Sequence, residues 1–370
     1  MSATFIIAAR RTPVAPRGGA LAALDLPALA VPVITAALHD AGIEAAAVDE
    51  LIVGNALGAG GNPARLIALS AGLPHAVAGL TIDRQCVSGL DAMLIGDAMI
   101  RAGRADVIVA GGVESYSRRP IRMRTFSDGR APEPYDQPPF APTPAQDPDM
   151  ADAADALATR CGITRAAQDA FAIESHARAR DAAARRGAEI TPLGGISADS
   201  FTRNLTAPLC ARAATVSGTI TAANAAVAAD GAAFCVLVSE KIAARITRAT
   251  VQIISGVTCG ADPAFPGIAP VAAIRASLRA AGLTAPEIGV VEMMEAYAAQ
   301  AIACIAQTGL VPERTNLGGG ALARGHPIGA SGAINAVRLW HELRRSGGTG
   351  LAAIAAAGGL GTAMVLRAGG

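Results

Sequence analysis

Apolar and polar positions follow two alternating patterns along this chain. Short, continuous apolar runs at 49–57, 80–83 and 105–112 are typical of buried β-strands. Between them, apolar residues recur at helical spacing over 27–42, which ends at a glycine, and over 87–103. Strands that alternate with helices predict an α/β fold with a largely parallel sheet covered by helices on both faces.

The pattern is interrupted after Ser117. Prolines and arginines crowd the stretch from 120 to 148, and such a segment cannot continue a central strand. Helical spacing resumes over 151–187, and an apolar run at 230–240 returns to the core as a strand. We therefore expect 118–217 to form an inserted loop or lid domain.

The second half of the chain repeats the first. A strand at 288–297, a glycine-rich turn and helix at 325–347 and a strand at 351–359 follow earlier counterparts at offsets of roughly 240 residues. This duplication predicts that Cys86 and His326 lie at equivalent ends of two similar halves. The boundaries that follow are 1–117 plus 218–243 for the N-terminal half, 118–217 for the insertion and 244–370 for the C-terminal half.

Composition narrows the function. Apolar residues make up 52% of the chain and charged residues 16%, which excludes a disordered chain. With a net charge of +1, the basic surface needed for general nucleic-acid binding is missing. No apolar run reaches the ~20 residues that cross a bilayer, so we expect no membrane association and a cytoplasmic location. The cysteines and histidines lack ligand spacing, so we expect neither a metal site nor a disulfide framework.

Cys86 and His326 occupy positions that favour a catalytic role. Cys86 lies between a strand and the first turn of a helix, where free N–H groups and the helix dipole are expected to lower the thiol pKa. Those N–H groups can also stabilise an oxyanion. His326 precedes a helix in a constrained turn, which suits a general base for a thiol. The remaining cysteines are better explained as small buried apolar residues.

The motifs around these residues resemble those of the thiolase family, over nearly the whole chain. They are RQCVSGL (84–90), VIVAGGVES (107–115), GGGALARGHPIGASG (318–332) and AAGGLGTAMV (356–365). The resemblance implies a thiolase fold, with two duplicated βαβαβ-type halves, each built on a mixed sheet, in a five-layer αβαβα core with an inserted loop domain. It also implies that Cys86 takes up the acyl group, that His326 activates it, and that homodimers or homotetramers form. The backbone N–H groups of Cys86 and Ala357 are the expected oxyanion donors.

Two positions depart from the family pattern. Met294 stands where the Asn-Glu-Ala-Phe motif has its asparagine, and a thioether cannot donate a hydrogen bond. Ala355 stands where the family has a second cysteine that exchanges protons at the α-carbon. These substitutions predict weakened Claisen and thiolysis chemistry, while acyl transfer from Cys86 remains possible.

The coenzyme contacts also differ from the family pattern. Ala225 and Ala226 occupy the segment that touches the pantetheine arm in the family, and Arg118 and Arg119 are candidate contacts for nucleotide phosphates. A solvated run of charge explains these arginines equally well. We expect a coenzyme A thioester or an acyl-carrier pantetheine as the acyl donor, and no permanently bound cofactor.

Three functions therefore compete. The leading interpretation is a thiolase-like acyltransferase that forms an acyl-thioester on Cys86. The first alternative is a conventional acetyl-CoA C-acyltransferase in which neighbours such as Glu295 or Tyr297 replace the missing groups. The second alternative is a non-catalytic subunit with a thiolase fold.

Overall fold

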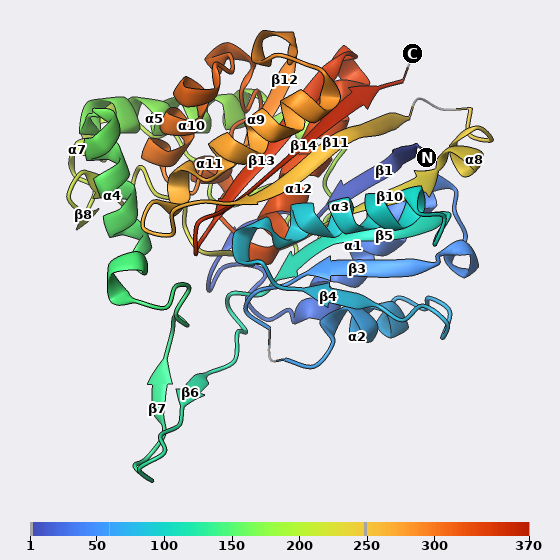
Figure 1. Ribbon diagram of the computed structural model, residues 1–370, viewed down its shortest axis with the longest axis horizontal. Helices are drawn as coiled ribbons and strands as arrows, with labels where there is room; N and C mark the ends of the chain where they lie inside the picture. The colour runs from blue at the N-terminus through green and yellow to red at the C-terminus, as the bar shows by residue number, and fades with distance from the viewer. Residues whose placement is uncertain (1–2, 59, 248–249, 370) are drawn as a thin grey trace.

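The strands form two halves joined at the centre of the molecule. The computed structural model describes residues 3–58, 60–247 and 250–369, and Figure 1 shows their arrangement. The strand order is β12-β13-β14-β11-β1-β10-β5-β3-β4, and antiparallel pairing of β1 with β11 joins the halves. On the two sides of this junction the orders β1-β10-β5-β3 and β11-β14-β13-β12 correspond, which confirms the predicted duplication.

The strands of the N-terminal half are β1 (Thr4–Arg11), β3 (Glu50–Gly54), β4 (Leu80–Ile82), β5 (Val107–Glu114) and β10 (Ala229–Ser239). Those of the C-terminal half are β11 (Val251–Gly260), β12 (Val290–Met293), β13 (Thr349–Ala356) and β14 (Leu360–Ala368).

The prediction of a largely parallel sheet was wrong. Strand β3 pairs in parallel with β4 and β5, and β12 with β13, but the other pairs of the central order are antiparallel. One cause is the tight turn from β13 to β14, in which Gly358 and Gly359 both have a φ of 75°. Glycine adopts this conformation readily, and so short a turn can only join antiparallel strands. The sheet is mixed, as the family resemblance implied.

The helices complete an αβαβα order of layers. Helices α1 (Leu26–Ala41) and α2 (Pro63–Ser70) cover the outer face of the N-terminal half. Helices α9 (Pro270–Ala281) and α10 (Ala298–Thr308) lie on the outer side of the C-terminal half. Between the halves, α3 (Ser88–Arg101) packs against α12 (Ile328–Ser346), and both contact strands of the two halves. The central layer therefore consists of the two helices that begin beside Cys86 and His326.

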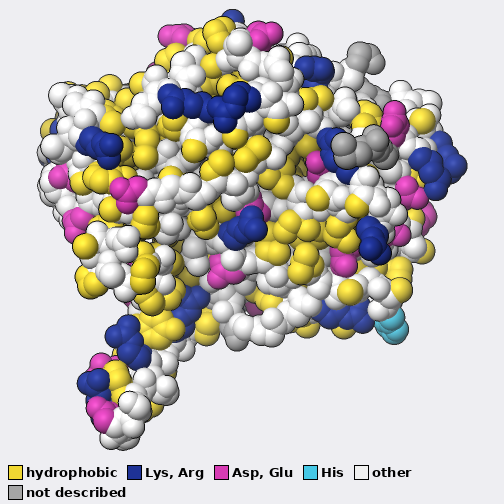
Figure 2. All heavy atoms as spheres, in the orientation of Figure 1, with side chains coloured by type: hydrophobic (Ala, Val, Ile, Leu, Met, Phe, Trp, Pro, Cys, Tyr) yellow, Lys and Arg dark blue, Asp and Glu magenta, His cyan; other side chains and the backbone are white. Residues whose placement is uncertain are grey.

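The predicted insertion contains a projecting hairpin followed by helices. Its hairpin strands β6 (Arg122–Arg124) and β7 (Glu133–Tyr135) pair antiparallel and extend away from the body, and Figure 2 shows basic side chains on this projection. Helices α4 (Met150–Cys161) and α5 (Arg165–Asp181) pack on α10. The domain boundaries themselves stay predictions. The described residues also form β2 (Ala15–Pro16), β8 (Thr215–Ser217), β9 (Ile220–Thr221), α6 (Ala183–Arg186), α7 (Ala207–Ala211), α8 (Glu240–Ala243), α11 (Ala321–Arg324) and short 3-10 helices at Ala45–Ala47, Gln85–Val87, Pro144–Gln146, Pro266–Ile268, Ala285–Glu287 and Pro312–Arg314.

Ion pairs anchor the insertion to the core. The buried guanidinium of Arg11 in β1 binds Glu189 and Asp199, each at 2.7 Å. Although burial opposes ionisation, Arg338 and Arg11 hold the pKa of Glu189 down at about 2. Although burial opposes its ionisation too, Arg11 and Arg186 hold the pKa of Asp199 low, so both carboxylates are charged near neutral pH. Each has two arginine partners, because Arg338 also binds Glu189 and Arg186 also binds Asp199.

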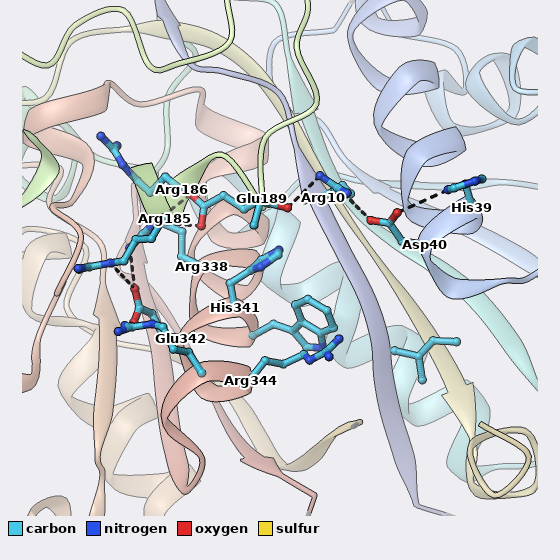
Figure 3. Close-up of a pocket in the computed structure, with 14 residues that line it drawn as sticks. Arg10, His39, Asp40, Arg185, Arg186, Glu189, Arg338, His341, Glu342 and Arg344 are labelled. Carbon is cyan, nitrogen blue, oxygen red and sulfur yellow. Dashed lines mark hydrogen bonds and ion pairs between the residues drawn. The ribbon is translucent and has the colours of Figure 1, made fainter. Parts of the chain in front are cut away.

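A surface hollow of about 670 Å³ lies over this network (Figure 3). Its carboxylates face its arginines: Arg338 binds Glu189 at 2.9 Å, and Arg185 lies 3.6 Å from Glu342. The residues that line it include no cysteine, serine or threonine. We therefore regard this hollow as a structural ion-pair region.

Two absences apply to the described part of the chain. Within it, no helix is long and apolar enough to cross a membrane. The same residues contain no group of three or more histidine, cysteine or acidic side chains that could hold a metal ion.

Candidate active site

Glycines bring Cys86 and His326 together. Cys86 lies in the 3-10 turn Gln85–Val87 before α3, and His326 lies just before α12. A Cβ atom on Gly89 would approach the carbonyl oxygen of Gly329 to 2.7 Å, and one on Gly112 would approach it to 2.1 Å. Because neither glycine has a side chain, the two helix starts can pack closely. As a result, Nε2 of His326 lies 3.2 Å from Sγ of Cys86.

Ser331 orients the imidazole. Its hydroxyl lies 2.7 Å from Nδ1 of His326 and donates to the carbonyl oxygen of Pro327 at 3.0 Å. Since the hydroxyl proton is used on Pro327, the hydroxyl oxygen accepts from Nδ1–H. In this tautomer Nε2 carries no proton and faces the thiol. His326 is therefore arranged as an acceptor for the proton of Cys86.

A strained backbone presents the thiol. Gln85 has a φ of 56°, which non-glycine residues rarely adopt. The Ser88 hydroxyl donates to the carbonyl oxygen of Gln85 at 2.6 Å and accepts from the N–H of Arg84 at 2.8 Å. The carboxylate of Asp83 accepts from the N–H of Gln85 at 2.8 Å. These bonds hold the unfavourable conformation in place immediately before Cys86.

The expectation of a lowered thiol pKa was wrong. Burial and, next, the carboxylate of Glu114 raise the pKa of Cys86 to about 12, although the backbone N–H groups of Cys86 and Ala357 act in the opposite direction. Burial, assisted by the guanidinium of Arg324, lowers the pKa of His326 to about 4. The resting pair near neutral pH is therefore a thiol and a neutral imidazole.

Glu114 is a site residue that the sequence did not reveal. It ends β5, is fully buried, and accepts from Nδ2 of Asn55 at 2.8 Å and from the N–H groups of Ala56 and Leu57, each at 3.1 Å. It also accepts from the N–H of Gly329 at 2.9 Å, in the turn that follows His326. Burial raises the pKa of Glu114 to about 7. The available signal was a carboxylate at the end of an otherwise apolar strand.

Cys86 and His326 open into a cavity of about 280 Å³. Ala355 and Ala357 line it, so both predicted positions on the β13 side lie beside the thiol. Met294 does not line it, because its side chain is fully buried in the central apolar core. Of the two substituted family positions, Ala355 therefore borders the cavity, whereas Met294 lies in the apolar core outside the cavity lining.

Glu295 and Tyr297, the two residues considered as replacements for the missing groups, differ in whether they line the cavity. The Glu295 carboxylate accepts from Ser175 at 2.7 Å, Asn316 at 2.6 Å and the N–H of Leu322 at 3.2 Å, and it does not line the cavity. Tyr297 lines the cavity, and its hydroxyl has no hydrogen-bond partner among the described residues. Burial raises the pKa of Tyr297, and a charge on Cys86 would raise it further. Tyr297 is thus a phenol in its protonated form within the site.

The predicted coenzyme residues are only partly brought together. Ala226 lines the cavity, and Ala225 forms an isolated bridge with Tyr297. Arg119 lines a neighbouring hollow, where it binds Asp136 at 2.9 Å. Arg118 lines neither space.

Comparison with known proteins identifies the family. The model of the thiolase N-terminal domain matches residues 4–241, and that of the thiolase C-terminal domain matches residues 247–368. The chain belongs to the thiolase family. This thiolase is therefore an acyltransferase by class, and its fold is the one that the motifs implied.

Similar proteins cover the whole chain. An acetyl-CoA acetyltransferase of Pseudomonas aeruginosa is 39% identical, over 99% of this thiolase and 99% of the relative. The crystal structure of the Bacillus anthracis acetyl-CoA acetyltransferase has a TM-score of 0.93 at 34% identity and covers 100% and 99% of the two chains. That of human mitochondrial 3-ketoacyl-CoA thiolase in complex with CoA has a TM-score of 0.92 at 30% identity, with 100% and 98% covered.

Proposed function

We propose that this thiolase is an acyl-CoA C-acyltransferase that carries the acyl group on Cys86 and uses a substituted proton-transfer group. The names of its relatives favour this alternative over an enzyme confined to acyl transfer. The observation that carries the proposal is the 3.2 Å contact between Nε2 of His326 and the thiol, inside a cavity. The coenzyme A in the human thiolase complex supports coenzyme A thioesters as its substrates.

In the acylation step, His326 accepts the thiol proton as Sγ attacks the thioester carbonyl carbon. The N–H groups of Cys86 and Ala357, which face the thiol, stabilise the oxyanion. When the tetrahedral intermediate collapses, the carbon–sulfur bond of the substrate breaks. The proton on His326 then passes to the departing thiolate, so His326 returns to its neutral form.

In cleavage of a 3-ketoacyl thioester, Sγ of Cys86 instead attacks the 3-keto carbon, and His326 takes the thiol proton and keeps it. The bond between the 3-keto carbon and the α-carbon then breaks, and the departing α-carbon needs a proton. Among the described residues that line the cavity, Cys86 is the one cysteine, so a second thiol cannot supply it. We assign this proton to the Tyr297 hydroxyl, which lies in the cavity without a partner. The incoming thiol of coenzyme A returns a proton to the tyrosinate before its sulfur takes the acyl group from Cys86. The Cys86 thiolate then recovers the proton held by His326, which balances the cycle.

A second candidate function is favoured by Ala355. This residue lines the cavity but carries no exchangeable proton, as expected for an enzyme that acylates Cys86 and passes the acyl group on without breaking a carbon–carbon bond. In this scheme the acyl donor is a coenzyme A thioester or an acyl-carrier pantetheine. The two candidates differ in whether 3-ketoacyl thioesters are cleaved.

Acylation and cleavage can be measured separately. Intact-mass analysis after incubation with acetyl-CoA tests acylation, with Cys86→Ser as the negative variant and Cys161→Ser as the matched control. Absorbance loss of acetoacetyl-CoA in the presence of coenzyme A tests cleavage. We expect Tyr297→Phe to lose cleavage by about 10²–10⁴-fold, with acylation within tenfold of the wild type. Ala355→Cys should restore cleavage in the Tyr297→Phe background.

Each outcome selects one function. Cleavage that depends on Tyr297 supports the C-acyltransferase. Acylation of Cys86 without cleavage in the wild type supports the acyl-transfer enzyme. Failure of every acyl-CoA donor to modify Cys86 contradicts both and favours the non-catalytic subunit.

The assembly that we propose is a homo-oligomer. Leu66 and Leu69 in α2 and Leu80 in β4 are large apolar side chains between 40% and 55% exposed. Strand β4 ends the strand order, so its free edge can pair with another strand. Apolar side chains beside a free sheet edge favour burial against a second copy.

A further inference from the structure

A second hollow adjoins the Cys86 cavity. It measures about 530 Å³ and lies where the hairpin β6–β7 leaves the body. Tyr116, Arg122 and Asp136 line both spaces. The two spaces are therefore adjacent, and the side chain of Arg122 borders both.

The second hollow carries excess positive charge. Arg17, Arg119 and Arg122 line it against one carboxylate, that of Asp136, which binds Arg119 at 2.9 Å. Among the described residues, neither Arg17 nor Arg122 has a carboxylate within 4.0 Å. In the hollow of Figure 3, by contrast, carboxylates pair with arginines across the space.

Of the three arginines in the second hollow, Arg122 is the one that also lines the Cys86 cavity. Its guanidinium donates to the carbonyl oxygen of Ala56 at 3.0 Å, which occupies one of five N–H donors. Nη1 of Arg119 is buried and has no hydrogen-bond partner. The N–H donors of Arg122 that have no partner among the described residues at the edge of the cavity suit a carboxylate, which a guanidinium can bind in bidentate geometry.

We propose that this thiolase acts on acyl thioesters whose acyl chain ends in a carboxylate, and that Arg122 binds that carboxylate. The proposal rests on the proposed function, since the acyl chain must be attached to Cys86. It deepens that function by naming the substrate class. The neighbouring Arg17 and Arg119 add positive potential at the same end of the chain.

The phosphate groups of coenzyme A are also anions that an arginine can bind. The experiment must therefore hold the coenzyme constant and change only the end of the acyl chain. Suitable pairs of equal chain length are succinyl-CoA with butyryl-CoA, glutaryl-CoA with pentanoyl-CoA, and adipoyl-CoA with hexanoyl-CoA. The measurement is kcat/KM for acylation of Cys86, followed by intact-mass analysis.

We expect at least one carboxylated thioester to exceed its neutral partner by tenfold or more in the wild type. Arg122→Gln should lower kcat/KM for that thioester by about 10–100-fold, the range for a hydrogen bond to a charged group. Its neutral partner should change by less than about twofold. Arg122→Lys should recover part of the loss. Arg124→Gln is the matched control, because Arg124 is exposed in the same strand and lines neither space.

The contrary results are distinct. An equal loss for carboxylated and neutral thioesters in Arg122→Gln assigns the arginine to coenzyme A phosphates and overturns the proposal. No preference for a carboxylate in the wild type, with neutral thioesters still acylating Cys86, overturns the proposal but leaves the proposed function intact. No acylation by any of the six thioesters overturns both. Circular dichroism and the thermal midpoint of Arg122→Gln show whether the variant is folded, and the wild-type comparison alone tests the substrate class.

Discussion

Replacing His326 with glutamine tests how the thiol of Cys86 becomes a nucleophile. With a pKa of about 12, the thiol is almost wholly protonated at neutral pH. At pH 7.5 roughly one molecule in 3 × 10⁴ carries the thiolate without help. His326, with its Nε2 atom 3.2 Å away and its pKa lowered to about 4, is available to take the proton during attack. His326→Gln should therefore slow acylation by about 10²–10⁴-fold, the upper limit being set by the thiolate fraction.

The pH dependence makes this prediction specific. In the wild type, His326 is neutral above pH ~5 and the thiol is protonated below pH ~11, so the acylation rate should change little between pH 6 and 9. In His326→Gln the rate should follow the thiolate and rise about tenfold per pH unit from pH 7 to 10. The assay is quenched-flow acylation by acetyl-CoA, read by intact mass. His39→Gln is the control, because the side chain of His39 is 88% exposed.

Acylation by His326→Gln within tenfold of the wild type at pH 7.5 would refute the role of His326 as the base. The same pH profile in both proteins would refute it too, because the base would then lie elsewhere. A loss of rate without the steep pH slope would mean that the substitution disturbs substrate binding rather than proton transfer.

Three further predictions concern residues around the site and the sheet edge. Glu114→Gln should lower the thiol pKa, speed alkylation of Cys86 by iodoacetamide at pH 8, and cost about 1–3 kcal/mol in urea unfolding, since its amide leaves a buried N–H unpaired; slower alkylation would contradict the assigned charge effect. Ser331→Ala should lower the acylation rate about tenfold or more by freeing the imidazole tautomer, with little change in the thermal midpoint, and an unchanged rate would show that the turn alone orients the ring. Leu80→Glu should shift the mass measured by light scattering toward the monomer, and an unchanged mass would place the interface away from β4.

Much of the fold was predictable because it depends on local patterns. Helices α1 and α3 begin and end within two residues of the predicted spans, since each has a clear apolar periodicity and a glycine at or near its end. Strands β3 and β12 end earlier than predicted, at Gly54 and Met293. The apolar residues continue past both ends, but Asn55 and Glu295 there bond to Val113 and Asn316 instead of continuing the strand pairing. Partners so distant in the chain leave no trace in a local pattern.

By itself, the sequence determined the duplication, the junction at Cys86, the turn at His326 and the residue types missing at Met294 and Ala355. These follow from residue identity and spacing, which are local properties. Only the tertiary structure decided that the thiol pKa is raised, that Glu295 points away while Tyr297 faces the cavity, and that Arg122 joins two spaces. Burial and electrostatic potential sum over residues far apart in the chain, so the same cysteine at a helix start can be acidic or inert depending on what the fold packs around it.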